Sequence, residues 1–287
     1  MKSDLLSIIK NDYADFSKSQ KLIADFVLNN YDKAAFMTAA RLGTAIGISE
    51  STVVRFACFL GYDGYPSFQK ALQEIARSRL NNIQRMDLYF DRIGDNIISN
   101  VLESDIARIR QTIDEVSEED FNRAADAIIN AENIYIIGTR SSSVLASFLH
   151  YYFGLIFENV HLVSSGSANG LYEQIFRIKN GDIMIGISFP RYSKTTIKAL
   201  EFARDNGADT LAVTDSMLSP IAGRANHIIL ARSDMASFVD SLVAPLSILN
   251  ALIAAISIKK HSETAESFKI LESIWEKYDV YEKSGES

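Results

Sequence analysis

Residues 38–66, TAARLGTAIGISESTVVRFACFLGYDGYP, predict two short helices joined by a tight turn. Thr38 and Ser49 have side chains that cap a helix N-terminus, so a helix is expected to begin directly after each of them. Gly47 and Gly61 follow the two helices, and glycine readily adopts the left-handed conformation that ends a helix. Two helices separated by such a turn are typical of a helix-turn-helix, whose second helix enters a DNA groove.

The apolar residues of both helices recur at helical spacing and are expected to face inward. They are Leu42, Ala45 and Ile46 in the first helix, and Val53, Phe56, Ala57 and Leu60 in the second. This leaves the first turns of the second helix with an outward polar set, which is Glu50, Ser51, Thr52 and Arg55. A recognition helix presents its first turns to base edges and phosphates, so these four are the predicted DNA contacts. Arg41 and Lys70 are weaker candidates for phosphate contacts, and a salt bridge to Glu50 or Asp63 is the alternative role of Arg55.

The chain has 287 residues, of which 47% are hydrophobic and 23% charged, with a net charge of −7. This size and composition are typical of a two-domain globular protein. Residues 1–80 hold 10 basic and 8 acidic side chains, a net charge of +2, whereas the remainder carries −9. Because DNA is a polyanion, the weakly basic N-terminal part must rely on a local patch and on dimerisation.

Cys58 is the one cysteine, which excludes an internal disulfide and a cysteine-based metal site. It lies among apolar helix positions, so a packed thiol is expected. The four histidines are scattered without metal-ligand spacing, and the N-terminal residues lack the apolar run of a signal peptide. The most apolar run, residues 242–258, contains Pro245 and several polar residues, which favours a buried helix over a membrane span. The protein is therefore expected in the cytoplasm.

Three segments follow one another along the chain. Residues 1–79 are helical, and their first strongly amphipathic helix is expected to place Leu22, Ile23, Phe26 and Val27 on one inward face. Residues 80–117 form a helical connector whose apolar residues recur at roughly helical spacing, at Leu88, Ile93, Ile97, Val101, Ile106, Ile109 and Ile113. Either the second domain or a partner subunit must cover this face, and the pattern does not decide between them.

Residues 118–287 alternate helical patterns with short apolar runs, which are 134–137, 161–163, 182–187, 210–213 and 227–230. Five apolar strands separated by helices predict a parallel sheet covered on both faces. The expected fold is therefore an all-α helix-turn-helix domain followed by a flavodoxin-like, three-layer α/β/α domain with a five-stranded parallel sheet.

In an open parallel sheet, ligands bind at the carboxyl ends of the strands near the point where strand order reverses. Polar residues follow the first strand at Thr139, Arg140, Ser141 and Ser142, and the third strand at Ser188, Arg191 and Ser193. Backbone N–H groups at a helix start, together with hydroxyls and a cation, form a phosphate cradle. Simple capping by Ser141 or Ser193 would explain one such loop, but two loops on strands that should be adjacent favour phosphate binding. A third polar stretch, residues 164–169, ends the second strand and is expected to contact sugar hydroxyls.

Two other site types fit less well. A dinucleotide site needs the glycines of G-x-G-x-x-G, and here Arg140 and Ser143 occupy two of those positions. An isomerase needs a positioned base, and Glu173 is the best candidate. A solvated or sugar-binding carboxylate is the simpler interpretation of Glu173.

The chain resembles the RpiR-type bacterial transcription regulators, which join an N-terminal helix-turn-helix domain to a sugar isomerase (SIS) domain used as a sensor. The N-terminal resemblance rests on Thr38-Ala-Ala, Gly47-Ile-Ser49, Thr52-Val-Val-Arg55-Phe, Leu60-Gly61-Tyr62 and Gly64-Tyr65. SIS domains often carry G-x-G-x-S after the first strand, and here Gly138 and Ser142 match while Arg140 replaces the second glycine.

SIS domains also often carry S-x-S-G-x-T after the third strand. Ser188 matches, Ser193 replaces the threonine, and Pro190 and Arg191 replace the serine and glycine. The altered pattern leaves two roles open for Arg191, which either pairs with a phosphate or fills the pocket.

The resemblance implies a regulator of carbohydrate metabolism that binds operator DNA as a homodimer or homotetramer and responds to a phosphorylated sugar, without a cofactor. A sugar-phosphate isomerase with an accessory N-terminal domain is the runner-up. A regulator whose SIS domain serves only for dimerisation is the third possibility.

Overall fold

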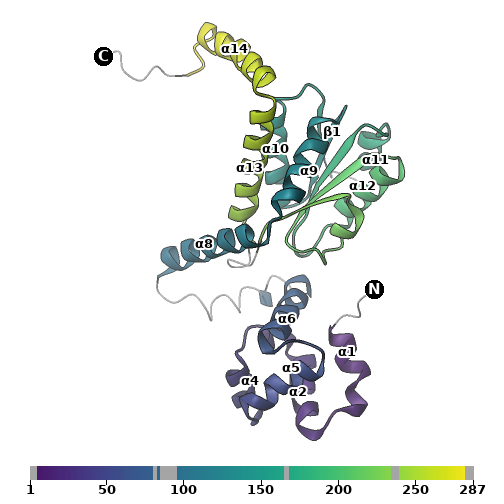
Figure 1. Ribbon diagram of the computed structural model, residues 1–287, viewed down its shortest axis with the longest axis vertical. Coiled ribbons are helices and arrows are strands. Elements are labelled where there is room, and N and C mark those ends of the chain that lie inside the picture. Colours follow the sequence, from purple (N-terminus) through teal and green to yellow (C-terminus); the bar gives the residue numbers. More distant parts are fainter. Residues whose placement is uncertain (1–4, 80–82, 85–95, 165–167, 234–238, 282–287) are drawn as a thin grey trace. The chain divides into compact units, whose positions relative to one another are not determined.

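The structure is a computed structural model that describes residues 5–79, 83–84, 96–164, 168–233 and 239–281 (Figure 1). The chain divides into two compact units, residues 1–97 with 235–239 and residues 98–234 with 240–287. Each unit has its own buried apolar core. The predicted connector residues Leu88 and Ile93 lie outside the described residues.

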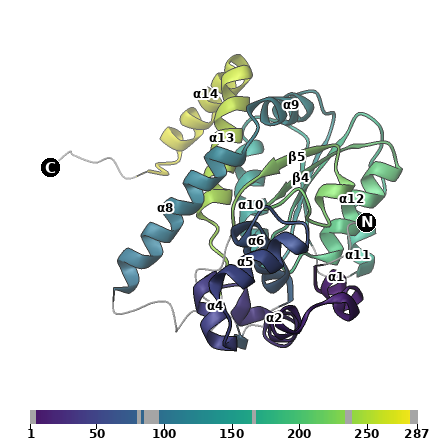
Figure 2. The ribbon, with the colours of Figure 1, turned by 60° about the horizontal axis from the view of Figure 1, so that its bottom comes forward.

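The described part of the first unit is helical. Its elements are α1 (Leu5–Asn11), the 3-10 helix η1 (Tyr13–Asp15), α2 (Lys18–Asn29), α3 (Tyr31–Ala34), α4 (Ala39–Ile46), α5 (Glu50–Phe59) and α6 (Tyr65–Arg79). Helix α5 lies at the centre of the unit and contacts α2, α4 and α6 (Figure 2). Its fully buried Phe56 packs edge-on against Phe16 and Phe68, with ring centroids 5.4 and 6.1 Å away. Edge-to-face packing of this kind adds stability beyond the buried area.

Helix α6 is tied to the chain before α4 by hydrogen bonds to one carbonyl. The Tyr65 hydroxyl and the Gln69 side-chain amide each donate to the Met37 carbonyl oxygen at 2.8 Å. Burial raises the pKa of Tyr65 to about 12, so this hydroxyl stays protonated and remains a donor at physiological pH.

Three predictions of inward-facing residues in this unit are wrong. Leu22 is 46% exposed, and Ala45 and Cys58 are also exposed. In α4 the buried position belongs to Gly43 instead of Ala45, because the turn approaches so closely that a Cβ at Gly43 would lie 2.7 Å from a backbone oxygen. Cys58 directly follows the buried Ala57, and a step of about 100° per residue turns its side chain away from the core.

The second unit is built around a five-stranded sheet, as predicted. The strands are β1 (Ile134–Gly138), β2 (Val160–Val163), β3 (Ile183–Ile187), β4 (Asp209–Thr214) and β5 (His227–Leu230). They are parallel and lie in the order β2-β1-β3-β4-β5. The order reverses between β1 and β3, which are hydrogen-bonded neighbours.

Helices cover both faces of the sheet (Figure 1). They are α9 (Glu118–Ile129), α10 (Ser142–Phe153), α11 (Ala168–Ile175), α12 (Lys194–Asp205) and α13 (Val243–Lys259), with a 3-10 turn η2 (Ala222–Arg224). Ile134 and Ile136 share a core with α9, α10 and α13, whereas Tyr135 and Ile137 share one with α11 and α12. This alternation places α10 and α12 on opposite faces, which confirms the expected three layers.

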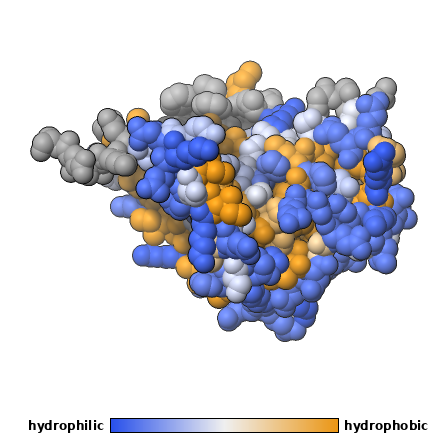
Figure 3. Space-filling view, turned by 90° about the horizontal axis from the view of Figure 1, so that it is seen from above, coloured by the Kyte–Doolittle hydropathy of each residue, from blue (hydrophilic) through white to orange (hydrophobic). Residues whose placement is uncertain are grey.

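Two further helices belong to this unit, α8 (Ile97–Glu115) and α14 (His261–Lys277). Apolar patches interrupt the hydrophilic surface on the face seen in Figure 3, and the exposed side chains of α14 include Phe268, Ile270 and Ile274. No single helix of the described residues is long and apolar enough to span a bilayer. By length and composition, α13 and α14 meet that requirement only as a pair, which is bent by 99°.

Replacing Phe56 by alanine tests the aromatic core of the first unit. Because Phe56 is 1% exposed, the substitution should destabilise this unit by about 3–5 kcal/mol, the usual cost of removing a buried phenyl ring. The measurement is urea denaturation followed by circular dichroism. Phe59 is the matched control, since it also packs on Phe16 but is 55% exposed. An equal loss in Phe59→Ala would contradict the central role of Phe56.

Candidate functional site

The helix-turn-helix is set by hydroxyl caps at the start of both helices. The Thr38 hydroxyl accepts a hydrogen bond from the Arg41 backbone N–H at 3.2 Å, and Ser49 accepts one from the Thr52 N–H at 3.3 Å. Gly47 ends α4 with a φ of 73°, a left-handed conformation that glycine adopts without strain. These local contacts fix where α5 starts and therefore which residues occupy its first turns.

The four predicted DNA contacts lie together at the start of α5. Glu50, Ser51 and Arg55 are exposed and Thr52 is half-exposed. Glu50, Ser51 and Arg55 line a shallow, open hollow together with Ser49 and Val54.

Side-chain contacts within this turn hold Arg55 in place. The Arg55 guanidinium donates to the Ser51 carbonyl oxygen at 3.3 Å and to the Thr52 hydroxyl at 3.5 Å. These partners are uncharged, so its positive charge remains available to an anion. The two weaker candidates, Arg41 and Lys70, are exposed on α4 and α6.

The loop after β1 is one of the two predicted phosphate-binding loops. Gly138 ends the strand. A Cβ at this position would collide with the Ser142 carbonyl group, so only glycine fits here. Ser142 opens α10 and is 6% exposed, whereas Ser141 and Arg140 are exposed and Thr139 is half-exposed. Arg140 has a φ of 54°, a left-handed conformation that is unfavourable for a residue with a side chain.

The loop after β3 likewise combines a buried serine with an exposed arginine in a left-handed conformation. Ser188 is 3% exposed and its hydroxyl accepts a hydrogen bond from the Ser193 backbone N–H at 3.1 Å. Ser193 in turn caps α12 by accepting from the Thr196 N–H at 3.3 Å. Arg191 is exposed and has a φ of 68°. The next residue, Tyr192, donates its hydroxyl to Asp215 at the end of β4, at 2.9 Å.

The sheet brings these two loops to one edge. Gly138 of β1 lies opposite Ile187 of β3 in the parallel register, so both loops start at the same level. Their helices, α10 and α12, cover opposite faces of the sheet. The loops therefore separate at the switch point, which is the place where open parallel sheets bind ligands.

Only part of the third polar stretch can be placed. The Ser164 backbone N–H donates to the Gln174 side-chain oxygen at 2.9 Å, and the Gln174 amide donates back to the Ser164 carbonyl oxygen at 3.0 Å. Residues 165–167 lie outside the described residues. Glu173 is exposed on α11, next to Gln174.

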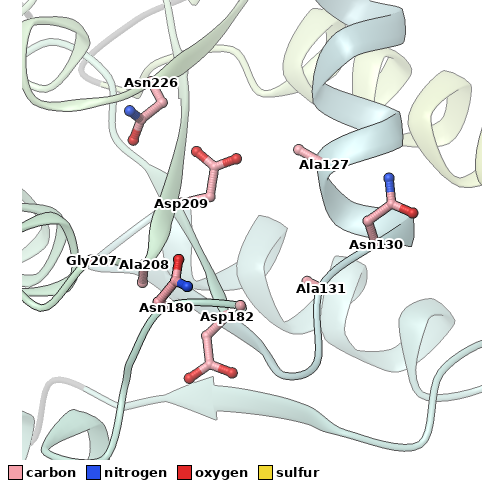
Figure 4. A pocket seen from close by; sticks show the side chains of 10 residues that line it. Ala127, Asn130, Ala131, Asn180, Asp182, Gly207, Ala208, Asp209 and Asn226 are labelled. Atoms are coloured by element: carbon pink, nitrogen blue, oxygen red, sulfur yellow. The ribbon is translucent and has the colours of Figure 1, made fainter.

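A separate polar hollow of about 500 Å³ lies at the opposite, amino edge of the sheet, and sequence reasoning did not identify it. Figure 4 shows Asp182, Asp209 and Asn226 around it. Asp182 accepts hydrogen bonds from the Asn133 amide and the Lys179 N–H at 2.6 and 3.0 Å. Asp209 accepts from the Thr210 N–H and lies 2.9 Å from the His227 ring. Both carboxylates thus hold the chain in place where β3 and β4 begin. Among the described residues, no group of three or more potential metal ligands is found.

Comparison with known proteins identifies both units. The helix-turn-helix domain of the rpiR family matches residues 3–78, and the SIS domain matches residues 127–255. An uncharacterized HTH-type transcriptional regulator of Caldanaerobacter subterraneus is 26% identical over 91% of this chain and 93% of its own length. The transcriptional regulator HexR of Pseudomonas aeruginosa is 25% identical over 90% of both chains.

Two solved structures share the fold. The sugar isomerase domain of an RpiR transcription factor from Sphaerobacter thermophilus is 26% identical and covers 60% of this chain and 96% of its own, with a TM-score of 0.58. Vibrio vulnificus NanR, solved with ManNAc-6P, is 22% identical and covers 94% of this chain and 97% of its own, with a TM-score of 0.59.

The relatives that match over the whole chain are named transcriptional regulators, so the isomerase alternative has no support from them. The chain belongs to the RpiR-type family of transcriptional regulators, in which a helix-turn-helix domain is followed by a SIS domain.

Proposed function

We propose that this regulator binds operator DNA through the first turns of α5 and senses a phosphorylated sugar at the carboxyl edge of its SIS sheet. The observation that carries the sensing role is the meeting of two hydroxyl-bearing loops at the switch point between β1 and β3. The complex of NanR with ManNAc-6P supports the same class of ligand.

The DNA-binding role rests on the chemistry of the α5 N-terminus. Arg55 supplies a positive charge, and Ser51, Thr52 and Glu50 supply acceptors or hydroxyl donors that can reach base edges. Arg41 and Lys70 are proposed to contact the flanking phosphates. Because residues 1–80 carry a net charge of only +2, a single unit would bind weakly. We therefore infer that two or four copies bind together, each occupying one half-site.

The sensing role rests on two helix N-termini that start within these loops. Helices α10 and α12 each have 12 residues, so their first backbone N–H groups carry a substantial positive dipole end. Ser142 and Ser188 are buried beside these N-termini, with Thr139, Ser141 and Ser193 at their rims. Arg140 and Arg191 bring cationic charge to the same two loops. Such a set favours a dianionic phosphate, and Glu173 is proposed to bind a sugar hydroxyl.

Regulation requires that the sugar phosphate bind one arrangement of the subunits better than another. The DNA-binding units would then change their spacing relative to the two half-sites.

A thermal-shift panel of phosphorylated sugars and their unphosphorylated counterparts tests the sensing role. A ligand that binds the native state must raise the unfolding temperature by mass action. We expect a shift with at least one phosphorylated sugar and none with its free sugar. In Ser142→Ala and Ser188→Ala, the Kd should rise about 10- to 100-fold because a hydrogen bond to a charged oxygen is lost. Ser247→Ala, on the exposed side of α13, should leave the Kd unchanged. Unaltered affinity in both loop variants would place the ligand elsewhere.

Arg55→Ala tests the DNA-binding role. The probe is double-stranded DNA that the wild-type protein selects from a random pool. We expect affinity to fall about 10-fold or more, and the dependence of log K on log salt to become shallower if Arg55 contacts phosphate. Lys18→Ala, exposed on α2, provides a control for charge alone. A folded Arg55→Ala variant with wild-type affinity would remove Arg55 from the DNA interface.

Two substitutions of Arg191 separate its charge from its backbone strain. Glycine relieves the left-handed strain and alanine retains it, so Arg191→Gly should be about 1 kcal/mol more stable than Arg191→Ala. Both remove the same charge, and both should weaken sugar-phosphate binding to the same degree in calorimetric titrations. Tighter binding in both variants would show instead that Arg191 fills the pocket.

A further inference from the structure

Helix α8 exposes an apolar stripe along its length. We define the α8 stripe as Ile98, Leu102, Ile106, Ile109 and Ile113. Ile98, Ile106 and Ile113 are 77%, 47% and 67% exposed. From Ile98 to Ile113 the stripe is about 22 Å long, at 1.5 Å per residue. An exposed aliphatic surface of this length marks an interaction site in a globular protein.

The polar side of the same helix is the buried side. Arg108 and Thr112 are 5% and 4% exposed. The Thr112 hydroxyl accepts a hydrogen bond from the backbone N–H of Arg232 at 2.9 Å, and the Arg232 guanidinium pairs with Glu115 through two hydrogen bonds. Near the middle of the helix, Ser241 donates to Asp105 at 2.6 Å.

These contacts prevent α8 from turning its stripe inward. Rotation would separate Glu115 from Arg232, which is only 8% exposed, and a buried charge that loses its partner is strongly destabilising. In Figures 1 and 2 the N-terminal half of α8 extends away from the sheet of its own unit. The described elements of this unit therefore leave the stripe largely uncovered.

The residue spacing favours another helix as the body that covers the stripe. Leu102, Ile106, Ile109 and Ile113 are separated by four, three and four residues, which is the seam spacing of a coiled coil. Glu103 and Arg110 are exposed beside the stripe. They are seven residues apart, which places them within about 20° of each other around the helix, on one flank.

This flank is self-complementary. When two identical helices pack antiparallel about a two-fold axis, residues on the same flank meet across the interface. An axis passing between Ile106 and Ile109 sets these two residues against each other and Leu102 against Ile113 of the second copy. It also brings Glu103 of each copy toward Arg110 of the other. In a parallel pair, by contrast, this flank would lie on opposite sides of the interface in the two copies, and Glu103 would not approach Arg110 of the partner copy.

We propose that α8 is a homodimerisation helix, which pairs antiparallel with α8 of a second copy of this chain through the α8 stripe. The inference rests on the proposed function only in requiring a symmetric assembly. Because α8 begins where the first compact unit ends, this pairing would set the separation of the two DNA-binding units.

Sedimentation velocity of the full-length protein, without DNA or sugar, tests the stripe. Leu102→Glu and Ile106→Glu should each weaken dimerisation at least 30-fold with an unchanged unfolding temperature, because both side chains are largely exposed within one chain. Ile270→Glu, at a 59% exposed position on α14, is the control and should dimerise like wild type. Unchanged dimerisation in both α8 variants would overturn the proposal. A lowered unfolding temperature with unchanged association would also overturn it, since the stripe would then be covered within the same chain.

Charge reversal tests the antiparallel orientation. Glu103→Arg and Arg110→Glu should each dimerise more weakly than wild type, because each creates two like-charge contacts. An equimolar mixture of the two variants should associate like wild type, as should the double variant. Single variants with wild-type affinity would show that this flank does not meet itself across the interface and would overturn the antiparallel pairing. The sugar-phosphate thermal shift should survive in Leu102→Glu, so failure of the dimer and failure of the sensing role are distinguishable.

Discussion

The parallel pairing of β1 with β3 is the constraint on which the proposed ligand-binding end of this molecule depends. It aligns Gly138 with Ile187, so two loops of similar composition begin at the same level. Since the chain passes from β1 to β2 before it returns to β3, α10 and α12 are placed on opposite faces of the sheet. The loops must then diverge, and two helix N-termini are directed at the space between them.

Both loops also hold an arginine in the left-handed region, at positions where the SIS patterns have glycine. Such backbone strain persists only where the surrounding structure enforces it, and it concentrates at functional sites. In Arg140 and Arg191 the strain accompanies an added positive charge. Both loops thus combine a backbone conformation that favours glycine with a cationic side chain.

Helix α8 has an inverted distribution of polarity: its polar side is buried and its aliphatic side is exposed. Its polar contacts are made with the segment that follows β5, which belongs to the same carboxyl edge as the two loops. Its aliphatic side chains point away from that segment. The ion pair between Arg232 and Glu115 therefore connects the carboxyl edge of the sheet directly to α8, the helix that follows the first unit.

Local chemistry allowed much of this to be predicted. The caps at Thr38 and Ser49, the turn at Gly47 and the five apolar strands involve neighbouring residues, so the sequence alone determined the helix-turn-helix and the parallel sheet. Which side of a helix is buried was decided only by the tertiary structure. For α8, the apolar repeat predicted which face would be covered. The structure buries the polar face instead, because Arg232 and Ser241, more than 100 residues later in the chain, form hydrogen bonds with it. The left-handed conformations of Arg140 and Arg191 likewise depend on the strands and helices that hold both ends of each loop, which no residue pattern encodes.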